Sequence, residues 1–286
     1  MTFYNRYMSG MTNGGSVYGH ALSNDELRAR VPSIFALEAH ESRSERFAAI
    51  PTIDVLDGLR SEGFDPFMAQ QARTRIAGKA EFTKHLVRLR HRSITNAAGA
   101  AFEIILVNAN DGTSSYQMIP GFFRFVCANG LMCGDTFGEV RVRHSGNAVH
   151  EVIEGAYTVL SEAPKVAEQV EQFKAITLTE AERSLLAEGA HSLRFPDATD
   201  DKPAPVRAPA LLRPRRNEDR VADLWTTFNT LQENAVKGGL LGHAWGASGR
   251  PVRRRTREVA GIDQNKALNR ALWTLTERMA ELKRAA

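Results

Sequence analysis

Apolar and polar residues alternate through the middle of the chain, from about residue 64 to residue 144. Successive side chains on a strand point to opposite faces of a sheet, so this period of two predicts β-strands. Ala101–Val107 is apolar at both parities, which favours a central strand, and Asn110-Asp111-Gly112 after it is typical of a hairpin turn. Strands are expected over these ranges: about 65–76, 82–92, 101–108, 115–126, 130–133 and 137–144.

Helical periodicity lies on both sides of this region. Ser23 with Glu26, and Thr179 with Glu182, have the spacing of a capping box, which begins a helix. Pro164 predicts a kink in the longest apolar stripe. Helices are expected over these ranges: about 23–31, 52–63, 148–176, 179–190, 218–237 and 264–284.

These elements predict an α+β protein, in which a mainly antiparallel sheet, a β-meander, is covered by a long helix. Residues 1–63 are expected to form an N-terminal arm with helices, and residues 64–192 the core of sheet and covering helices. Residues 193–216 contain five prolines and are expected to be an extended linker. Residues 217–286 are expected to form a C-terminal helical pair joined by a basic loop.

Composition places the chain among globular proteins, because its 286 residues are 43% hydrophobic and 24% charged. The net charge is +4, yet the segment 213–257 alone carries ten basic and four acidic residues. Two cysteines are too few for a disulfide framework, and the expected location is the cytoplasm. No apolar run approaches the ~18 residues of a membrane span, so no membrane partner is expected.

Arginines alternate with apolar residues on two of the expected strands. Arg88 and Arg90 oppose Val87 and Leu89 in parity. Arg141 and Arg143 have the same relation to their own apolar neighbours, and Arg73 and Arg75 also share one parity. The guanidinium fork matches phosphate, so an arginine face on a sheet suits a polyanion. The alternative is a solvated sheet face on which acids balance the arginines.

A second basic region lies between the last two expected helices. Five glycines, four arginines and one tryptophan in residues 238–255 predict a flexible basic loop. Basic grooves with aromatic side chains hold single strands of nucleic acid. The candidate nucleic-acid-binding residues are Arg73, Arg75, Arg88, Arg90, Arg92, Arg141, Arg143, Trp245, Arg253, Arg254 and Arg255.

Motifs for catalysis are absent from the sequence. It has no phosphate-binding loop, no dinucleotide fingerprint and no histidine pair at metalloprotease spacing, so no catalytic residue, metal ligand or cofactor is assigned. Two weaker hypotheses remain. A metal site would need His85, His91 and His144 to meet across the sheet, and a magnesium-dependent nuclease would need Asp111, Asp135 and Glu139 to cluster.

Several stretches resemble one known family: Phe82-Thr83-Lys84-His85-Leu86-Val87-Arg88, Leu106-Val107-Asn108 with Asp111-Gly112-Thr113-Ser114-Ser115-Tyr116, Phe123–Leu131, Val140–His144 and Gly261–Asn265. The family is domain of unknown function 932, which occurs on plasmids and prophages. The resemblance covers nearly the whole chain and implies no established activity or catalytic residue. The occurrence on mobile elements implies DNA recombination, replication support or evasion of host defence.

The order of elements, a strand meander followed by one long helix with basic strands, is also similar to the core of Rad52-like single-strand annealing proteins. Those proteins form rings or filaments that carry single-stranded DNA. The sequence therefore predicts a non-enzymatic protein that binds single-stranded DNA, forms a homo-oligomer and promotes strand annealing. One alternative is an interaction protein that inhibits a host defence factor. Another is the metal-dependent nuclease.

Overall fold

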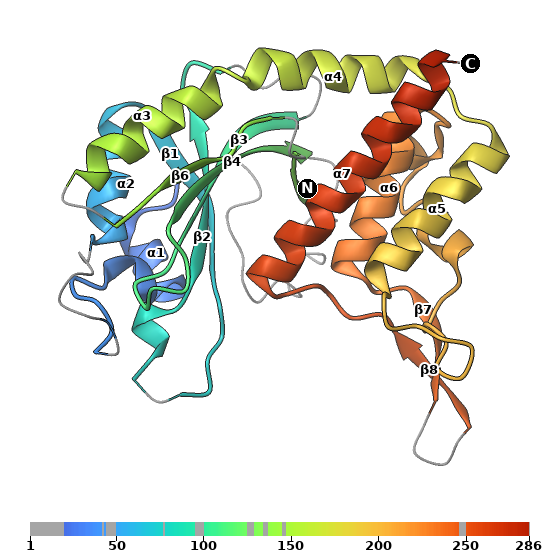
Figure 1. Cartoon of the computed structure of the whole chain (residues 1–286), viewed down its shortest axis with the longest axis horizontal. Coiled ribbons are helices and arrows are strands. Elements are labelled where there is room, and N and C mark those ends of the chain that lie inside the picture. The colour runs from blue at the N-terminus through green and yellow to red at the C-terminus, as the bar shows by residue number, and fades with distance from the viewer. Residues whose placement is uncertain are drawn as a thin grey trace, which may run out of the picture. The chain divides into compact units, whose positions relative to one another are not determined.

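The computed structural model describes residues 20–41, 43, 50–76, 78–94, 100–124, 129–133, 137–144, 147–245 and 250–285. The chain forms two compact units. The first comprises residues 1–130 with 138–163, and the second comprises residues 131–137 with 164–286 (Figure 1). Helices and an antiparallel sheet coexist in the chain, which confirms the expected α+β class.

A six-stranded sheet is built in the order β1-β2-β3-β4-β5, with β6 paired to the first residues of β4. Consecutive strands from β1 to β4 pair antiparallel, as the meander prediction requires. Every residue of β3 is buried, which agrees with its expected central place. The strands are β1 (Phe64–Gln71), β2 (His85–His91), β3 (Ala100–Asn108), β4 (Tyr116–Arg124), β5 (Asn129–Met132) and β6 (Val140–Val142).

Helices α2 (Thr52–Ser61) and α3 (Ala148–Leu160) cover one face of this sheet (Figure 1). Gly155 of α3 lies so close to β4 and β6 that a Cβ atom there would stand 2.4 Å from Met118 Cε and 2.8 Å from Val140 Cγ1. The small residue therefore lets the helix approach the sheet. Helix α1 (Asn24–Arg30) and the short 3-10 helix η2 (Pro32–Phe35) precede them, and a second 3-10 helix, η3 (Ala80–Phe82), lies between β1 and β2.

The long helix expected over residues 148–176 is instead two helices, α3 and α4 (Ala163–Ala175). The break falls at Ser161 and Glu162, just before Pro164. Proline has no backbone N–H to continue the hydrogen-bond ladder and disfavours helical geometry in the residue before it. The proline thus ends one helix and opens the next, and α3 is the part of the expected helix that packs on β4 and β6.

The second unit is helical around α6 (Leu224–Lys237), whose residues from Leu224 to Val236 are all buried. Its aromatic core centres on Trp273, whose ring centroid lies 5.6 Å from those of Phe173 and Phe228. The other helices are α5 (Glu180–Arg194), η5 (Ala208–Leu212), η6 (Asn217–Arg220) and α7 (Ile262–Ala285). Helix α5 begins with the expected capping box, in which the Thr179 N–H donates to Glu182 Oε2 at 2.7 Å.

The proline-rich segment is packed along the second unit. Leu211 is 1% exposed, and the Asn234 side chain of α6 donates to the carbonyl oxygens of Leu211 at 2.8 Å and Arg213 at 3.0 Å. Residues 193–216 thus belong to the same compact unit as α5 to α7. The four-part domain division with boundaries at 63, 192 and 216 stays a prediction.

The prediction of a flexible basic loop after α6 is wrong. The chain there forms a hairpin of β7 (Leu241–Trp245) and β8 (Pro251–Arg255). The chain passes from α6 into this hairpin through Gly238, whose backbone has φ 63° and ψ −137°. A Cβ atom there would also lie 2.7 Å from the carbonyl oxygens of Thr256 and Arg257. Residues other than glycine rarely adopt such a backbone conformation, and here their Cβ atom would also collide with these oxygens.

Gly238→Ala is therefore expected to destabilise the second unit by about 2 kcal/mol, the scale of a strained backbone residue. Denaturant unfolding followed by tryptophan fluorescence measures this effect, because Trp225, Trp245 and Trp273 all belong to that unit. Gly78→Ala is the control. Gly78 also has positive φ, of 75°, yet it lies in the first unit with nothing within 4 Å of a built Cβ atom. Equal loss of stability of the second unit in both variants would contradict the argument.

Candidate nucleic-acid interface

The β7–β8 hairpin is a basic two-stranded ribbon. Residues 241–255 contain four arginines and no acidic residue. His243 stands opposite Arg253, and Gly242 stands opposite Arg254. Pro251 occupies the first position of β8, where a missing N–H is tolerated. The glycines made this segment resemble a loop in sequence, while the pairing partner that makes it a ribbon is visible only in the folded chain.

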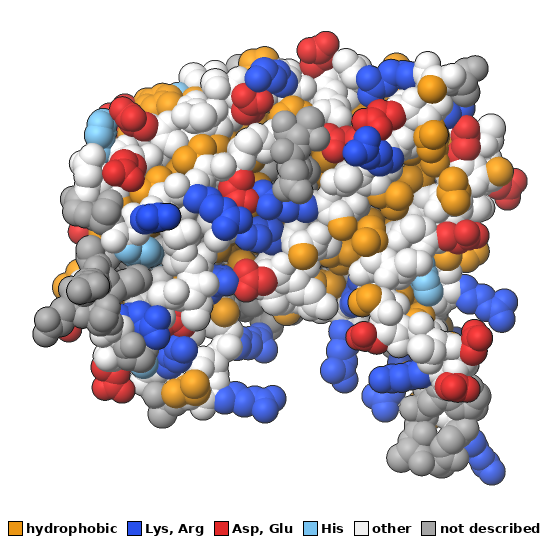
Figure 2. All heavy atoms as spheres, viewed as in Figure 1, with side chains coloured by type: hydrophobic (Ala, Val, Ile, Leu, Met, Phe, Trp, Pro, Cys, Tyr) orange, Lys and Arg blue, Asp and Glu red, His pale blue; other side chains and the backbone are white. Residues whose placement is uncertain are grey.

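Two hairpin arginines are exposed on opposite faces of the ribbon. Arg253 and Arg254 are consecutive on β8, so their side chains alternate across it. Within the described ranges, neither has an acidic side chain within ion-pair distance. Arg255 is exposed as well and donates to the Gly239 carbonyl oxygen at 2.8 Å. Figure 2 shows Lys and Arg side chains around this end of the second unit, with some acidic side chains nearby.

Three of the four acids of the basic segment are engaged elsewhere in the second unit. Glu233 accepts from Arg216 at 2.7 Å and lies 3.5 Å from Lys237 Nζ. Asp219 is buried and pairs with the same Arg216 at 3.0 Å. Asp223 caps α6 by accepting from the Thr226 N–H at 2.7 Å. These contacts leave the positive charge of the hairpin uncompensated within its own strands.

Arg88 and Arg90 of β2 lie in a different environment, around Glu103 of β3. Arg88 is 5% exposed and its Nη1 donates to Glu103 Oε2 at 2.8 Å. The Nε of Arg90 donates to Glu103 Oε1 at 2.9 Å. The Arg90 guanidinium also lies over the ring of Phe67, 4.3 Å from its centroid. One carboxylate therefore holds both guanidinium groups, so an acid balances them as the alternative anticipates, but the site is buried rather than solvated.

Arg141 of β6 shares a sheet face with Arg88. Strand register links Arg88 to Ile105, Ile105 to Ile119, and Arg141 to Gln117, two residues from Ile119. Arg141 is exposed on this face and its Nε lies 2.7 Å from Glu139 Oε1. Thus the strands do present arginines to one face, with carboxylates beside them.

The remaining candidates lie just beyond strand ends. Arg73 and Arg75 follow β1, which ends at Gln71 rather than at the expected residue 76, and Arg143 follows β6. All three are exposed, and the described part of the chain gives none of them an ion-pair partner. Arg92 follows β2 and forms a two-pronged pair with Asp65 at 2.8 and 2.9 Å. Trp245 belongs to β7, but its side chain lies outside the described residues.

A buried polar cluster joins the sheet to the start of α2, and sequence analysis did not identify it. His85 Nε2 lies 2.9 Å from Thr52 Oγ1, to which Asn108 Nδ2 donates at 3.0 Å. The hydroxyl of Tyr116 lies 3.3 Å from the same Thr52 oxygen, and Asn108 Oδ1 lies 2.9 Å from His144 Nε2. A signal was present, because His85 has the same strand parity as apolar Val87 and Leu89.

Burial sets the protonation of this cluster. Desolvation lowers the pKa of His85 to about 4, although its hydrogen bond to the Thr83 carbonyl opposes the change. Desolvation likewise raises the pKa of Tyr116. His85 is therefore neutral at physiological pH. Hydrogen bonds among buried side chains of separate elements, with His85 neutral, fit a structural core more closely than a reaction site.

Neither metal hypothesis gains support from the described residues. Among them, no group of three His, Cys, Asp or Glu side chains could hold a metal ion. The Asp111 carboxylate accepts a hydrogen bond from the Thr113 hydroxyl at 2.5 Å and lies 3.2 Å from Lys79 Nζ. Glu139 pairs with Arg141 as described above, and Asp135 lies outside the described residues.

None of the helices within the described ranges combines the length and the apolar character that a membrane span requires.

Comparison with known proteins places the chain in a family. It is similar to the UPF0380 proteins YafZ and YfjQ of Escherichia coli (strain K12), with 47% identity to each over 256 residues, 90% of this chain and 90% of each relative. No solved structure matches it. The family model described as domain of unknown function (DUF932) matches residues 39–273. The protein therefore belongs to the DUF932 family.

Proposed function

We propose that this protein binds nucleic acid, with single-stranded DNA as the substrate class, through the β7–β8 hairpin. One observation carries the proposal: Arg253 and Arg254 are exposed on a ribbon that contains no acidic residue. Exposed guanidinium groups release counterions when they meet phosphates, which drives binding to any polynucleotide. Asp219 and Glu233 of the same unit are occupied by Arg216 and Lys237, so these two carboxylates are balanced by two cations of their own.

The arginines of the sheet have two roles in this proposal. Arg88 and Arg90 stabilise the sheet, because a phosphate would have to displace Glu103 to reach them. The exposed Arg73, Arg75 and Arg143 are expected to add weaker contacts to the nucleic-acid backbone, since each is exposed just beyond the end of its strand. The hairpin is therefore the principal contact.

Strand annealing, a homo-oligomeric ring or filament, and service to a plasmid or prophage are the finer part of the proposal. They follow from the likeness in element order to annealing proteins, which is a fold-level analogy. Annealing is measured by the rate at which two complementary labelled strands pair in the presence of the protein. Particle size with and without DNA reports assembly.

The double variant Arg253→Ala/Arg254→Ala is expected to weaken binding of labelled single-stranded DNA and to lower the salt slope. Each lost phosphate contact removes about 0.7 from the slope of log K against log salt concentration, so the slope falls by about 1.4. Fluorescence anisotropy at three salt concentrations measures both quantities.

A matched control removes the same charge elsewhere in the second unit. Lys174→Ala/Arg278→Ala deletes a half-buried and an exposed cation, which pair with Glu171 at 2.6 Å and Glu281 at 2.7 Å on their own helices. This control is expected to retain the wild-type slope. If both double variants shift the slope equally, general charge rather than the hairpin governs binding. If the wild-type protein binds no nucleic acid at low salt, the function proposed here is wrong and an acidic protein partner becomes the better hypothesis.

A further inference from the structure

A cleft of about 430 Å³ lies along the base of the hairpin, within the second unit. One wall is the β7 backbone with Leu241 and His243, and the other is the proline-rich segment with Pro203, Pro205 and Ala210. Arg207 also lines it. The volume falls in the range of small-molecule sites, roughly 300–1,000 Å³.

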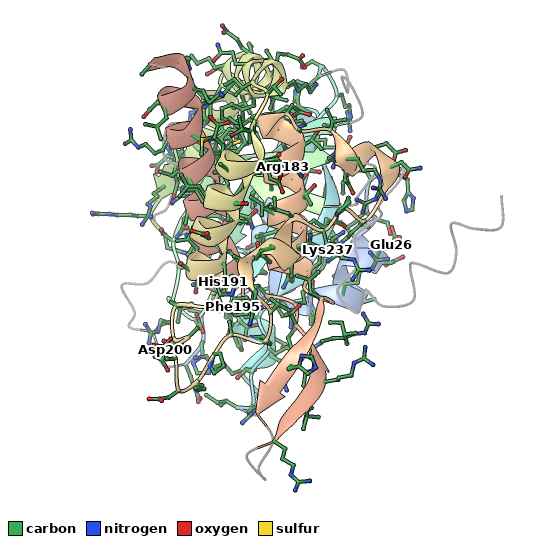
Figure 3. The ribbon with its side chains drawn as sticks, turned by 90° about the vertical axis from the view of Figure 1, so that its right-hand side faces the viewer. Glu26, Arg183, His191, Phe195, Asp200 and Lys237 are labelled. Carbon is green, nitrogen blue, oxygen red and sulfur yellow. The ribbon has the colours of Figure 1, made fainter. Side chains whose placement is uncertain are left out.

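The two walls are held together by backbone contacts. The His243 N–H donates to the Pro205 carbonyl oxygen at 2.8 Å, which occupies the free edge of β7. Gly242 permits this approach, since a Cβ atom there would lie 1.8 Å from the same oxygen. On the other side, His191 Nε2 donates to the Val206 carbonyl oxygen at 2.8 Å. Figure 3 labels His191 beside Phe195 at the end of α5, with Asp200 on the loop that leads to this wall.

The lining of the cleft is mixed, and its rim is cationic. Proline, alanine, valine and leucine side chains supply apolar carbons, while Arg207, His243 and the backbone supply polar atoms, and none of the lining residues is acidic. Arg207 is exposed and, among the described residues, has no ion-pair partner. Arg253 stands directly across the ribbon from His243, whose exposed imidazole lines the cleft. A base can stack on the imidazole ring of His243 while the cations at the rim meet the neighbouring phosphates.

We infer that this cleft holds one unpaired nucleobase of the bound strand, while Arg207 and Arg253 contact the phosphates on either side. The inference rests on the proposed function and adds a reason for strand selectivity. A base within a duplex is stacked and paired, so it cannot enter the cleft, whereas a single strand presents its bases freely. Single-stranded DNA is thus preferred to duplex of the same sequence.

Ala244→Phe tests the inference, because Ala244 lines the cleft and a phenyl ring there occupies the space of a base. The probes are a short labelled oligothymidine and an oligonucleotide of the same length built from abasic sites, which keeps the phosphates. The variant is expected to bind oligothymidine about tenfold more weakly than wild type does, the scale of one lost stacking contact. It binds the abasic strand as wild type does.

Val252→Phe is the matched control. Val252 stands opposite Ala244 on β8, is 41% exposed and does not line the cleft, so it is expected to retain wild-type affinity for oligothymidine. Ala210→Leu fills the cleft from the other wall and replaces Ala244→Phe if that variant fails to fold. Equal affinity of wild type for the two probes, or unchanged affinity of the cleft-filling variants, overturns the inference while leaving hairpin binding intact. Absence of binding to both probes instead overturns the proposed function.

Discussion

Glu103→Gln is expected to destabilise the first unit by about 3–5 kcal/mol, the typical cost of removing one partner from a buried ion pair. The carboxylate is 1% exposed and accepts from Arg88 at 2.8 Å and from Arg90 at 2.9 Å. Glutamine preserves the size of the side chain and removes its charge. Two guanidinium groups at 6% and 11% side-chain exposure then lose the carboxylate that both of them contact.

The destabilisation arises from desolvation rather than from lost packing. A buried cation has lost its hydration, and only a nearby anion compensates that loss. The combined variant Glu103→Leu/Arg88→Met/Arg90→Met removes all three charges together and is expected to recover much of the stability. Such recovery follows because apolar side chains of similar volume often replace buried ion pairs with little loss.

Hydrogen exchange of the β2 and β3 amides measures this effect, because the tryptophans all belong to the second unit and report on that unit alone. Asp65→Asn is the control. It removes an anion from β1 whose partner Arg92 is 63% exposed, so a small effect is expected. Wild-type protection of β3 in Glu103→Gln would contradict the prediction. An accompanying gain in DNA affinity would show that the freed arginines can reach phosphate.

The first unit is expected to lose about 3 kcal/mol of stability as the pH falls from 6.5 to 4, through His85 alone. Burial lowers the pKa of His85 to about 4, against an ordinary value of 6.5 in the unfolded chain. Between these two values the unfolded chain binds more protons than the folded chain. Stability therefore falls as the pH falls through this window and is unaffected by His85 above it.

The hydrogen bonds of His85 explain why the folded protein keeps this ring neutral. Its Nδ1 lies 3.3 Å from the Thr83 carbonyl oxygen, which can only accept, so Nδ1 carries the proton. Its Nε2 then accepts from the Thr52 hydroxyl at 2.9 Å. If Nε2 gained a proton, its N–H would face the donating hydroxyl of Thr52 until that hydroxyl turned away. No water reaches this buried site to accept the proton's hydrogen bond instead.

His85→Asn separates this contribution from that of other groups. The variant is expected to be less stable than wild type at pH 7. Between pH 6.5 and 4, however, its unfolding free energy is expected to depend less steeply on pH than that of wild type, with a slope lower by up to about 1.4 kcal/mol per pH unit. Hydrogen exchange of β2 amides at several pH values, corrected for intrinsic exchange rates, gives both slopes. Identical slopes for the two proteins would show that His85 does not titrate in this window.

Local sequence signals predicted the elements whose causes are local. The capping boxes at Ser23 and Thr179 begin helices as expected, because the bonds that form them span three residues. Alternation located the strands, and uniform apolarity marked β3 as central. The nucleic-acid role of the arginines is not decided by this agreement and stays a prediction.

Periodicity and capping signals in the sequence determined the α+β class and the meander order, since these depend on neighbours along the chain. Tertiary structure decided what the side chains do. It placed Glu103 against Arg88, and it gathered Thr52, His85 and Asn108 from three separate elements. It also turned a glycine-rich segment into a ribbon, because β7 and β8 satisfy each other's backbone hydrogen bonds. Such pairings depend on distances across space, which no pattern along one chain encodes.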